Sequence, residues 1–270
     1  MIIARHDPRE RVAAHHRAGV GIARIGYPIG IRRATVAARE YITPKMLRLT
    51  IEGPDLEGFH SYQADDHIKI VFAERDGTRR DPVPNGEQSL DWPHPSPPNR
   101  KYTVRRYDPA TLQMDLDFVL HHGGLASEWA GAVGIGEPVT IAGPAGAKAF
   151  PHTYAHYVFA VDATALPAAA RWLEESPQDV SCDLVIETVD PVEHSYPLPT
   201  RDRVRVHRIV RPPDRSLLME TVDGLTVPDR TFLFAAGEAG DIKPLRSWRK
   251  AEVDSLITGY WKRGVAGLDE

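Results

Sequence analysis

Residues 100–130 read RKYTVRRYDPATLQMDLDFVLHHGGLASEWA, and this stretch decides the fold. Apolar residues at 114, 116, 118 and 120 alternate here with Asp115, Asp117 and Val119, which is the period-two pattern of a half-buried β-strand. The adjacent glycines at 123 and 124 permit a tight turn, and Ser127 lies where a short helix begins. Residues 100–103 predict a further strand, followed along the chain by strand, glycine turn and helix.

The residues around this stretch extend it into a domain of short strands. We expect strands at 34–41, 46–51, 67–72 and 138–142, and strands at this spacing indicate an antiparallel barrel or sandwich. Residues 81–99 carry prolines at positions 82, 84, 93, 95, 97 and 98. So many missing N–H groups exclude a helix or a central strand. We interpret this segment as a long connecting loop.

From residue 156 onward, strands alternate with helices. We predict strands at 157–161, 183–189, 203–210 and 231–236, and helices at 165–175, 214–222 and 241–253. Nearly unbroken apolar strands are typical of parallel sheets, so this half is an α/β domain. The predicted fold is an N-terminal antiparallel β-barrel domain followed by a small parallel-sheet α/β domain. The boundaries are 1–30 for an N-terminal arm, 31–150 for the barrel and 151–270 for the α/β domain.

The composition excludes several classes of protein. The chain has 270 residues, of which 42% are hydrophobic, and its formal net charge is −4. The mixed charge argues against a nucleic-acid partner. Its one cysteine, Cys182, excludes a disulfide framework and a four-cysteine zinc site. Without a signal-peptide pattern or a run of about 18 apolar residues, we expect a cytoplasmic monomer with no membrane span. His6, His15 and His16 are expected to be solvated.

Three segments carry candidate chemistry. Arg100 and Tyr102 share one face of their strand and Thr103 points to the other. The Arg100 guanidinium suits a pyrophosphate, the Tyr102 ring suits a flat ligand, and the Thr103 hydroxyl suits a ring nitrogen; the alternative is an ordinary exposed strand. Ser127 either binds a phosphate at a helix N-terminus or caps the glycine turn. Residues 143–146, Gly-Pro-Ala-Gly, are either a platform beside a flat ring or a tight turn between domains.

In this order and spacing, the segments resemble the siderophore-interacting proteins, which are flavin reductases of the ferredoxin-reductase superfamily. The resemblance covers roughly residues 30 to 264. It rests on REYITPKMLR (39–48), DHIK (66–69), RKYTVRRYDP (100–109), DFVLHHGGLASEWA (117–130), VDATALPAAARWLE (161–174), FAAGEAGDIKPLR (234–246) and GYWKRG (259–264).

The resemblance implies FAD in the barrel domain and NADH or NADPH in the α/β domain. It assigns FAD to Arg100, Tyr102, Thr103, Asp117, Val119, His121, Gly124, Ala126, Ser127 and Trp129, with Tyr102 and Thr103 as catalytic residues. It assigns the nicotinamide dinucleotide to Asp162, Thr164, Ala165, Gly237, Glu238 and Ala239, which follow predicted strand ends. The choice of dinucleotide stays open, with a lean to NADH. Carboxylates at 187, 190 and 193 favour NADH, and arginines at 201, 203 and 205 favour NADPH.

The family reduces ferric siderophores, so the resemblance implies a cytoplasmic enzyme that passes electrons from NAD(P)H through FAD to Fe(III) and releases Fe(II). An anionic siderophore requires a basic pocket, for which we select Lys45, Arg48 and Lys262. No protein metal site is expected. One alternative is a general NAD(P)H:flavin oxidoreductase acting on another acceptor, such as a quinone. The other is a siderophore- or flavin-binding protein without catalytic activity.

Overall fold

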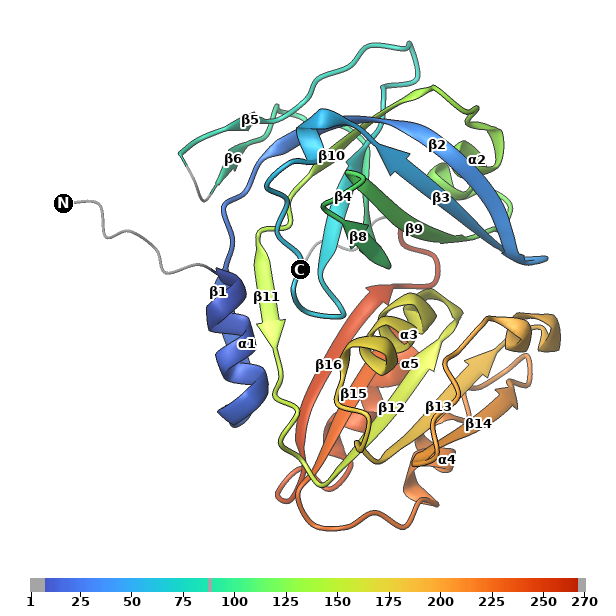
Figure 1. Ribbon diagram of the computed structural model, residues 1–270. Helices are drawn as coiled ribbons and strands as arrows, with labels where there is room; N and C mark the ends of the chain where they lie inside the picture. The colour runs from blue at the N-terminus through green and yellow to red at the C-terminus, as the bar shows by residue number, and fades with distance from the viewer. Residues whose placement is uncertain (1–7, 87–88, 267–270) are drawn as a thin grey trace.

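The computed structural model describes residues 8–86 and 89–266 and consists of two β-rich layers, one above the other in Figure 1. The upper layer is a seven-stranded sheet in the order β7-β4-β10-β2-β3-β9-β8, in which every pairing is antiparallel. All the strands predicted in this half are present. They are β2 (Ile31–Thr43), β3 (Met46–Glu52), β4 (His67–Val71), β7 (Asn99–Thr103), β8 (Arg106–Asp108), β9 (Gln113–Val119) and β10 (Pro138–Ala142).

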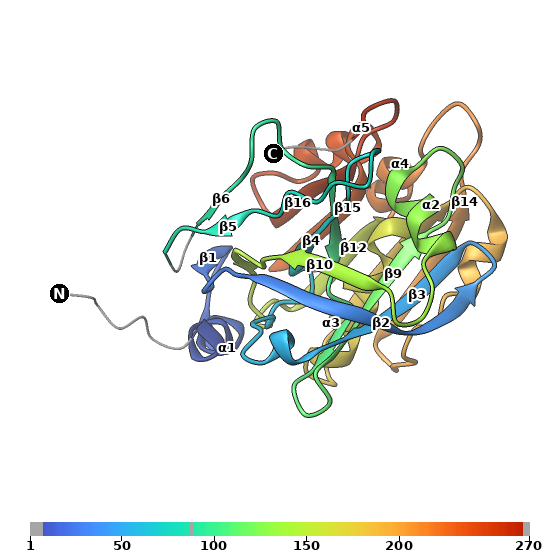
Figure 2. The same cartoon turned by 90° about the horizontal axis from the view of Figure 1, so that it is seen from above.

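One extended stretch, residues 99–108, joins the two edges of this sheet. Its first part, β7, pairs with β4, and its last part, β8, pairs with β9. At the change of partner, the Val104 N–H donates to Asp66 O (2.9 Å) and the Arg105 N–H donates to Asp115 O (3.0 Å). The sheet therefore curls round on itself, which confirms the predicted antiparallel barrel domain. Figure 2 shows the barrel from above, with α2 (Leu125–Ala132) beside β9.

The lower layer is a five-stranded parallel sheet in the order β14-β13-β12-β15-β16. Alternate residues of a strand face opposite sides of the sheet. Nearly every residue of the three central strands is buried, so both faces of the sheet are covered there. The aromatic rings of Tyr157, Phe159 and Phe232 pack under α3, and Val158 and Val185 pack under α4 and α5. The elements are β12 (His156–Asp162), α3 (Leu166–Glu175), β13 (Cys182–Thr188), β14 (Val204–Val210), α4 (Leu218–Asp223), β15 (Thr231–Glu238), α5 (Ala239–Ile242) and β16 (Asp254–Trp261).

The end of the chain departs from prediction. The helix expected at 241–253 is wrong, because α5 ends at Ile242 and a 3₁₀ turn follows at Lys243–Ser247. Pro244 cannot continue an α-helical hydrogen-bond ladder. The next residues form β16, which is an edge strand. Few of its side chains are buried, so its sequence lacks the unbroken apolar run that marked the central strands. The helix predicted at 214–222 starts only at Leu218.

From residue 8 onward, the N-terminal arm is an ordered part of the fold. Helix α1 (Pro8–Ala18) is followed by β1 (Ala23–Gly26), which pairs with β11 (Gly146–Ala149). The His16 ring stacks on His152 with 4.3 Å between centroids, and its Nε2 is 2.8 Å from Gln63 Oε1. The expectation of a solvated His16 is therefore wrong, because Val12 and its neighbours anchor the helix on an apolar patch. His6 lies outside the described residues.

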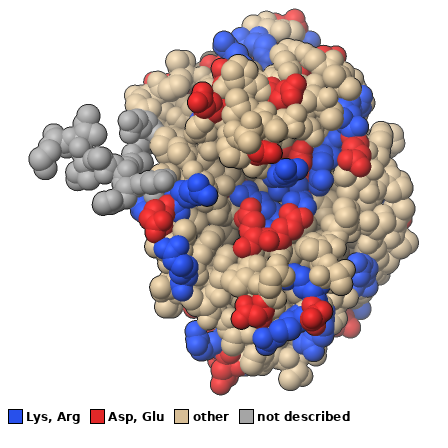
Figure 3. All heavy atoms as spheres, viewed as in Figure 1, with Lys and Arg blue, Asp and Glu red and all other residues tan. Residues whose placement is uncertain are grey.

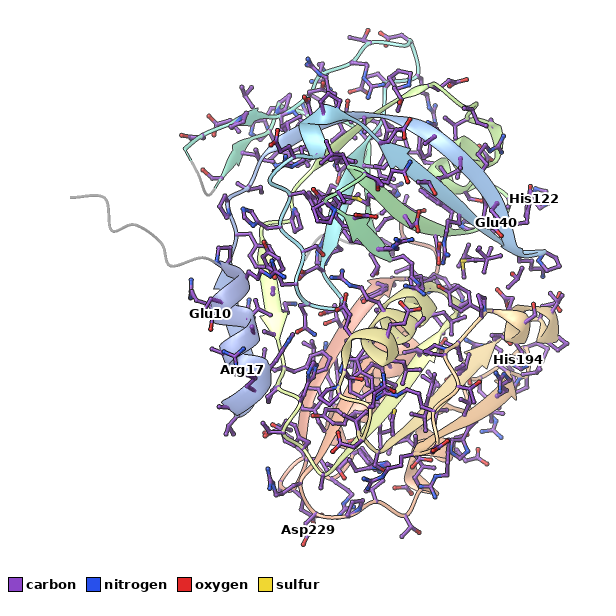
Figure 4. The ribbon with its side chains drawn as sticks, viewed as in Figure 1. Glu10, Arg17, Glu40, His122, His194 and Asp229 are labelled. Carbon is purple, nitrogen blue, oxygen red and sulfur yellow. The ribbon has the colours of Figure 1, made fainter. Side chains whose placement is uncertain are left out.

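Polar residues cover the outer side of α1. Glu10 and Arg17 form an exposed ion pair of 2.9 Å, and both are labelled on this helix in Figure 4. In its described residues, 81–86 and 89–99, the proline-rich segment is mostly a loop, as predicted, and its two-residue strands β5 (Val83–Pro84) and β6 (Leu90–Asp91) pair with each other. Figure 2 shows this pair of strands projecting to the side of the barrel.

Candidate functional site

Strand β7 places Tyr102 at one end of a row of aromatic rings. The Tyr102 ring lies 4.2 Å from Phe118, Phe118 lies 5.8 Å from Trp129, and Trp129 lies 5.4 Å from Phe72, all measured between centroids. Burial raises the pKa of Tyr102 well above that of an ordinary tyrosine. The row fixes the Tyr102 ring in place and holds Trp129 against the barrel.

The two faces of β7 differ in charge and polarity. Arg100 shares the Tyr102 face, and its Nη1 donates to Asn99 O at 2.7 Å. On the other face, Thr103 lies opposite His67, and Lys101 lies opposite Lys69. Directly opposed residues of antiparallel strands point to the same side, so two lysines stand next to Thr103 in one row. The Lys69 ammonium also lies 4.7 Å from the centroid of Trp92, which belongs to the proline-rich loop.

The glycine turn after β9 is held by Ser127. The Ser127 hydroxyl accepts from the His121 N–H and donates to the His121 carbonyl, both at 2.7 Å. A Cβ on Gly124 would lie 2.3 Å from the exposed His121 ring, so a side chain at this position would require that ring to move. His122 lies at the tip of the turn and is exposed (Figure 4). The hydroxyl of Ser127 is thus engaged within the turn, and anion binding here depends on the backbone N–H groups that open α2.

Two residues predicted to contact different ligands form one buried ion pair. Arg48 donates to both carboxylate oxygens of Asp117 (2.6 and 2.8 Å), and the Tyr196 hydroxyl donates to Asp117 at 2.6 Å. The side chain of Asp117 has no exposed surface. Arg105 of the barrel pairs with Glu174 of α3 beside this group. Acidic and basic side chains gather across the middle of the face in Figure 3, where the two layers meet. The Arg48–Asp117 pair itself lies within the barrel sheet, and the Tyr196 hydroxyl links it to the α/β layer.

The other two basic candidates are placed differently. Lys45 Nζ forms an ion pair with Asp190 at 2.9 Å, which again joins the barrel to the α/β layer. Lys262 follows β16, forms a β-bridge with Val265 and is exposed. The structure does not bring Lys45, Arg48 and Lys262 into one pocket around Thr103.

Asp162 joins three strand ends at the carboxyl edge of the parallel sheet. Its carboxylate accepts from the Thr164 N–H and hydroxyl (2.8 and 2.6 Å), the Glu238 N–H (2.9 Å) and the Trp261 indole N–H (2.7 Å). Burial raises the pKa of Asp162, and hydrogen bonds from Thr164 and Trp261 oppose that shift. A Cβ on Gly237 would lie 2.6 Å from this carboxylate, and the Gly237 φ of 148° suits glycine.

Glu238 closes the same edge from the other side. It is buried, and its carboxylate accepts from the Asp241 N–H (2.8 Å) and the Arg263 N–H (3.0 Å). Ala239 begins α5 at this point, and Ala165 precedes α3. The six residues assigned to the dinucleotide therefore lie together at the carboxyl ends of β12 and β15, joined by hydrogen bonds that no local sequence pattern predicts.

Arginines 201, 203 and 205 lie at the opposite end of the sheet. Arg205 pairs with Asp183 at the amino-terminal end of β13, and Arg201 caps carbonyls at the end of α3. The argument for NADPH from these arginines is wrong, because they lie far along the strands from the carboxyl edge. Arg211, which the sequence reading missed, follows β14 at that edge and pairs with Asp241 and Glu187.

Three buried oxygen atoms near Thr103 were not predicted from the sequence. Within residues 8–86 and 89–266, Asp65 Oδ1, Asp66 Oδ1 and the Tyr260 hydroxyl are buried without a hydrogen-bond partner. Thr103 is close enough to lower the pKa of Tyr260, yet the geometry is not that of a hydrogen bond. No local pattern marks such atoms, because they come together only when the two layers pack.

The described part of the chain contains neither a candidate metal site nor a candidate membrane-spanning helix. It holds no group of three or more histidine, cysteine, aspartate or glutamate residues with the geometry of a metal site. None of its helices has the length and apolar character needed to cross a bilayer.

An antiparallel barrel joined to a five-stranded parallel sheet defines the ferredoxin-reductase class of two-domain folds. Two family models match within it. The siderophore-interacting FAD-binding domain matches residues 35–148, and the siderophore-interacting protein model matches residues 154–264. The chain belongs to the siderophore-interacting protein family, as its sequence motifs predicted.

Individual relatives agree with this assignment. The ferric vibriobactin reductase ViuB of Vibrio cholerae serotype O1 is 29% identical over 238 residues, covering 84% of this chain and 87% of that protein. The NADPH-dependent ferric-chelate reductase of Escherichia coli (strain K12) is 36% identical over 152 residues, or 56% of this chain and 59% of that protein. The crystal structure of a siderophore utilization protein from T. fusca matches with a TM-score of 0.85 and 33% identity, covering 92% and 98% of the two chains.

Proposed function

We propose that this chain is a ferric-siderophore reductase that carries FAD against its barrel and takes electrons from a nicotinamide dinucleotide at the parallel sheet. One observation carries the proposal. Strand β7 carries Arg100, Tyr102 and Thr103, and the Tyr102 ring packs on Phe118 of β9, the strand that precedes the glycine turn and α2, in a chain of this family. The names of the Vibrio and Escherichia relatives support the same chemistry.

The residues present fit FAD. The N-cap of α2 is Gly124, which lacks a side chain, so a pyrophosphate can approach the first N–H groups of the helix closely. Arg100 supplies a planar donor for the same phosphates. The Tyr102 ring, held by Phe118, suits stacking on a flat ring, and the Thr103 hydroxyl suits a ring nitrogen. His121, Val119, Ala126 and Trp129 shape this site, whereas we assign Asp117 to linking the layers.

The carboxyl edge of the parallel sheet suits the dinucleotide. We place the nicotinamide beside Gly237, where only a glycine leaves room next to Asp162. Thr164, Ala165, Glu238 and Ala239 surround this point. We propose NADH as the preferred donor, because the carboxylate of Glu187 lies at the end of β13. A carboxylate at that position suits a ribose diol better than a 2′-phosphate.

The substrate is an anionic ferric chelate. Lys101 and Lys69 stand next to Thr103 on one face of the barrel, so an anion held there lies beside the flavin site. The Trp92 ring lies against Lys69 of this row and suits an aromatic ligand such as a catecholate. Lys262 is the remaining candidate contact, because acidic partners hold Lys45 and Arg48.

The roles of the protein groups follow from these positions. Bound FAD lets a two-electron donor serve Fe(III), which accepts one electron at a time. Arg100 and the α2 N-terminus hold the phosphates, Tyr102 fixes the plane of the ring, and Thr103 orients its polar edge. Hard oxygen ligands bind Fe(II) less tightly than Fe(III), so reduction releases the iron. We further propose that the protein works as a monomer in the cytoplasm.

Anaerobic half-reactions test the proposal. The purified protein is expected to be yellow and to lose its visible flavin band when NADH is added, and to need more NADPH for the same loss. Ferric catecholate, ferric hydroxamate and a quinone are then compared as acceptors. Faster recovery of the band with the ferric chelates supports the proposal. Preference for the quinone indicates a general flavin oxidoreductase, and a yellow protein that NAD(P)H does not bleach indicates a binding protein.

A further inference from the structure

Two adjacent carboxyl groups lie buried at the junction of the two layers. Asp65 and Asp66 directly precede β4 and are 9% and 2% exposed. Asp66 Oδ2 accepts three hydrogen bonds, from the Tyr27 hydroxyl (3.0 Å) and from the N–H groups of Tyr62 (2.8 Å) and Gln63 (3.0 Å). Asp65 Oδ1 has no partner within the described chain. Buried polar atoms without partners are rare in proteins and mark places where a water, a ligand or a proton is handled.

Tyr260 lies near this carboxyl pair and near Thr103, and its buried hydroxyl has no hydrogen-bond partner among the described residues. Burial raises the pKa of Tyr260, the charge of Asp65 raises it further, and Thr103 lowers it. Tyr260 and Ala64, which precedes Asp65, pack in the same apolar cluster between the layers. A phenolic hydroxyl both donates and accepts hydrogen bonds. It is therefore suited to pass a proton between the Thr103 side and Asp65.

The two carboxyls differ in how well the protein supports their charge. Burial raises the pKa of both. Three donors and the nearby Arg171 guanidinium favour the ionised form of Asp66. Asp65 has no such set of donors, and the negative charge of Asp66 adds to the effect of burial, so the pKa of Asp65 rises to about 7. Of the pair, Asp65 is the carboxyl whose charged form the protein supports less well.

The proposed reaction produces a proton inside the protein. Its balance is NAD(P)H + 2 Fe(III) → NAD(P)⁺ + 2 Fe(II) + H⁺. The hydrogen that leaves the nicotinamide with two electrons stays behind as a proton once both electrons have passed to iron. A buried site needs a base to take up that proton.

We propose that Asp65 is this base, that its unpartnered Oδ1 accepts the proton as iron is reduced, and that the Tyr260 hydroxyl carries the proton from the Thr103 side. The inference rests on the proposed function. The charged groups that face Asp65 are Asp66 beside it, Lys148 on β11, Arg171 on α3 and Tyr260 on β16. The lysine and arginine favour the charged base, and Asp66 favours its protonation.

The test separates the two half-reactions. Asp65→Asn keeps the size of the side chain and removes the base, and Tyr260→Phe removes only the hydroxyl. Asp179→Asn, at an exposed position remote from this cluster, is the matched control. Bleaching by NADH is measured first, followed by anaerobic recovery of the flavin band with ferricyanide from pH 5 to pH 9.

We expect recovery in the wild type to slow as the pH falls below the pKa of Asp65, because the protonated acid cannot accept. Asp65→Asn is expected to recover about 100-fold more slowly at pH 8, without this pH dependence, and Tyr260→Phe about 10-fold more slowly. Bleaching by NADH is expected at the wild-type rate in both. Recovery of Asp65→Asn at the wild-type rate, or equal slowing of both half-reactions, overturns the inference and leaves the proposed function standing.

The apoprotein gives a second readout that needs no flavin. Carbon-13 NMR of labelled aspartates is expected to show one side chain that titrates near pH 7, present in Asp179→Asn and absent in Asp65→Asn. If every aspartate titrates below pH 5, the inference fails. A protein that binds no FAD defeats the proposed function, and with it the inference.

Discussion

The two ligand-facing edges of this molecule satisfy their polar groups in different ways. At the carboxyl edge of the parallel sheet, Asp162 accepts four hydrogen bonds from Thr164, Glu238 and Trp261, so the edge is closed by its own side chains. At the proposed flavin edge, α2 begins at Gly124 without a side-chain cap, and the only printed bond of the Arg100 guanidinium among the described residues is to its neighbour's carbonyl. A closed edge depends on bonds within the protein, and an open edge depends on a ligand. Substitutions at the first are expected to cost stability, and at the second to cost affinity.

The largest effect is expected where the two layers are joined. Asp117→Asn leaves the Arg48 guanidinium without its ionic partner in a site where the aspartate side chain has no exposed surface. Removing one partner of a buried pair costs about 3 kcal/mol. Urea unfolding of the apoprotein measures this loss. Glu10→Gln breaks the exposed pair with Arg17 and serves as control, with no measurable change expected. Equal stability of the two variants would show that the Asp117 pair does not hold the layers together.

The next largest effect tests the closed edge itself. Gly237→Ala places a Cβ 2.6 Å from the Asp162 carboxylate on a backbone with φ of 148°. Strain of this kind costs about 2 kcal/mol, and it displaces the carboxylate that accepts four hydrogen bonds from three neighbouring residues. Gly224→Ala is the matched control in the same layer, because its nearest contact is an ordinary 3.5 Å. If both variants unfold at the wild-type temperature, the hydrogen bonds to Asp162 do not stabilise this edge.

The closed edge also shows what the sequence could and could not predict. The strand ends that carry Asp162 and Gly237 followed from unbroken apolar runs, which report burial on both faces of a sheet. Strand β16 was missed because an edge strand buries little and its apolar pattern is weak. The link from Trp261 to Asp162 crosses 99 residues of chain. No local pattern reports such a contact, since it forms only after the strands have been ordered in the sheet.

Substitutions at the flavin edge are expected to weaken the binding of FAD without changing the stability of the protein. Arg100→Ala removes a charge-assisted phosphate contact, which is worth about 1.5–3 kcal/mol, or roughly 10- to 100-fold in the dissociation constant for FAD. The unfolding free energy of the apoprotein is expected to be unchanged, because Arg100 bonds only its neighbour's carbonyl among the described residues. Arg106→Ala, an exposed arginine six positions along, is the control. Wild-type affinity in titration calorimetry would remove Arg100 from the proposed site.

The flavin edge is predicted from sequence motifs, which described the contacts between its residues only in part. Tyr102 and Arg100 lie where strand alternation places them. The hydrogen bonds of Ser127 agree with the alternative interpretation, in which its hydroxyl caps the turn. Arg48 and Asp117 were assigned separate ligands, because a bidentate pair between strands 69 residues apart leaves no mark on spacing. Charge on a side chain shows that a partner is needed, and only the fold decides whether that partner is a ligand or another residue.

The smallest effect is expected where helix α1 packs on the rest of the chain. Burial lowers the pKa of His16, and burial followed by the charge of His16 lowers the pKa of His152 to about 3. An unfolded histidine titrates at about 6.5, so the unfolded state binds more protons below that pH. The stability from these rings is fully present above pH 6.5 and is lost as the pH falls toward 3.

At pH 5 we expect a loss of about 1 kcal/mol relative to pH 7, a value that allows for the partial exposure of both rings. Because other buried histidines such as His156 also have a lowered pKa, the measurement is a difference between proteins. His152→Phe is expected to lose part of this pH dependence in urea unfolding, whereas His122→Asn, on the exposed tip of the glycine turn, is expected to keep it. Equal pH dependence in both variants would mean that the stacked pair is not what acid opens, and that α1 is held by Val12 and its apolar contacts alone.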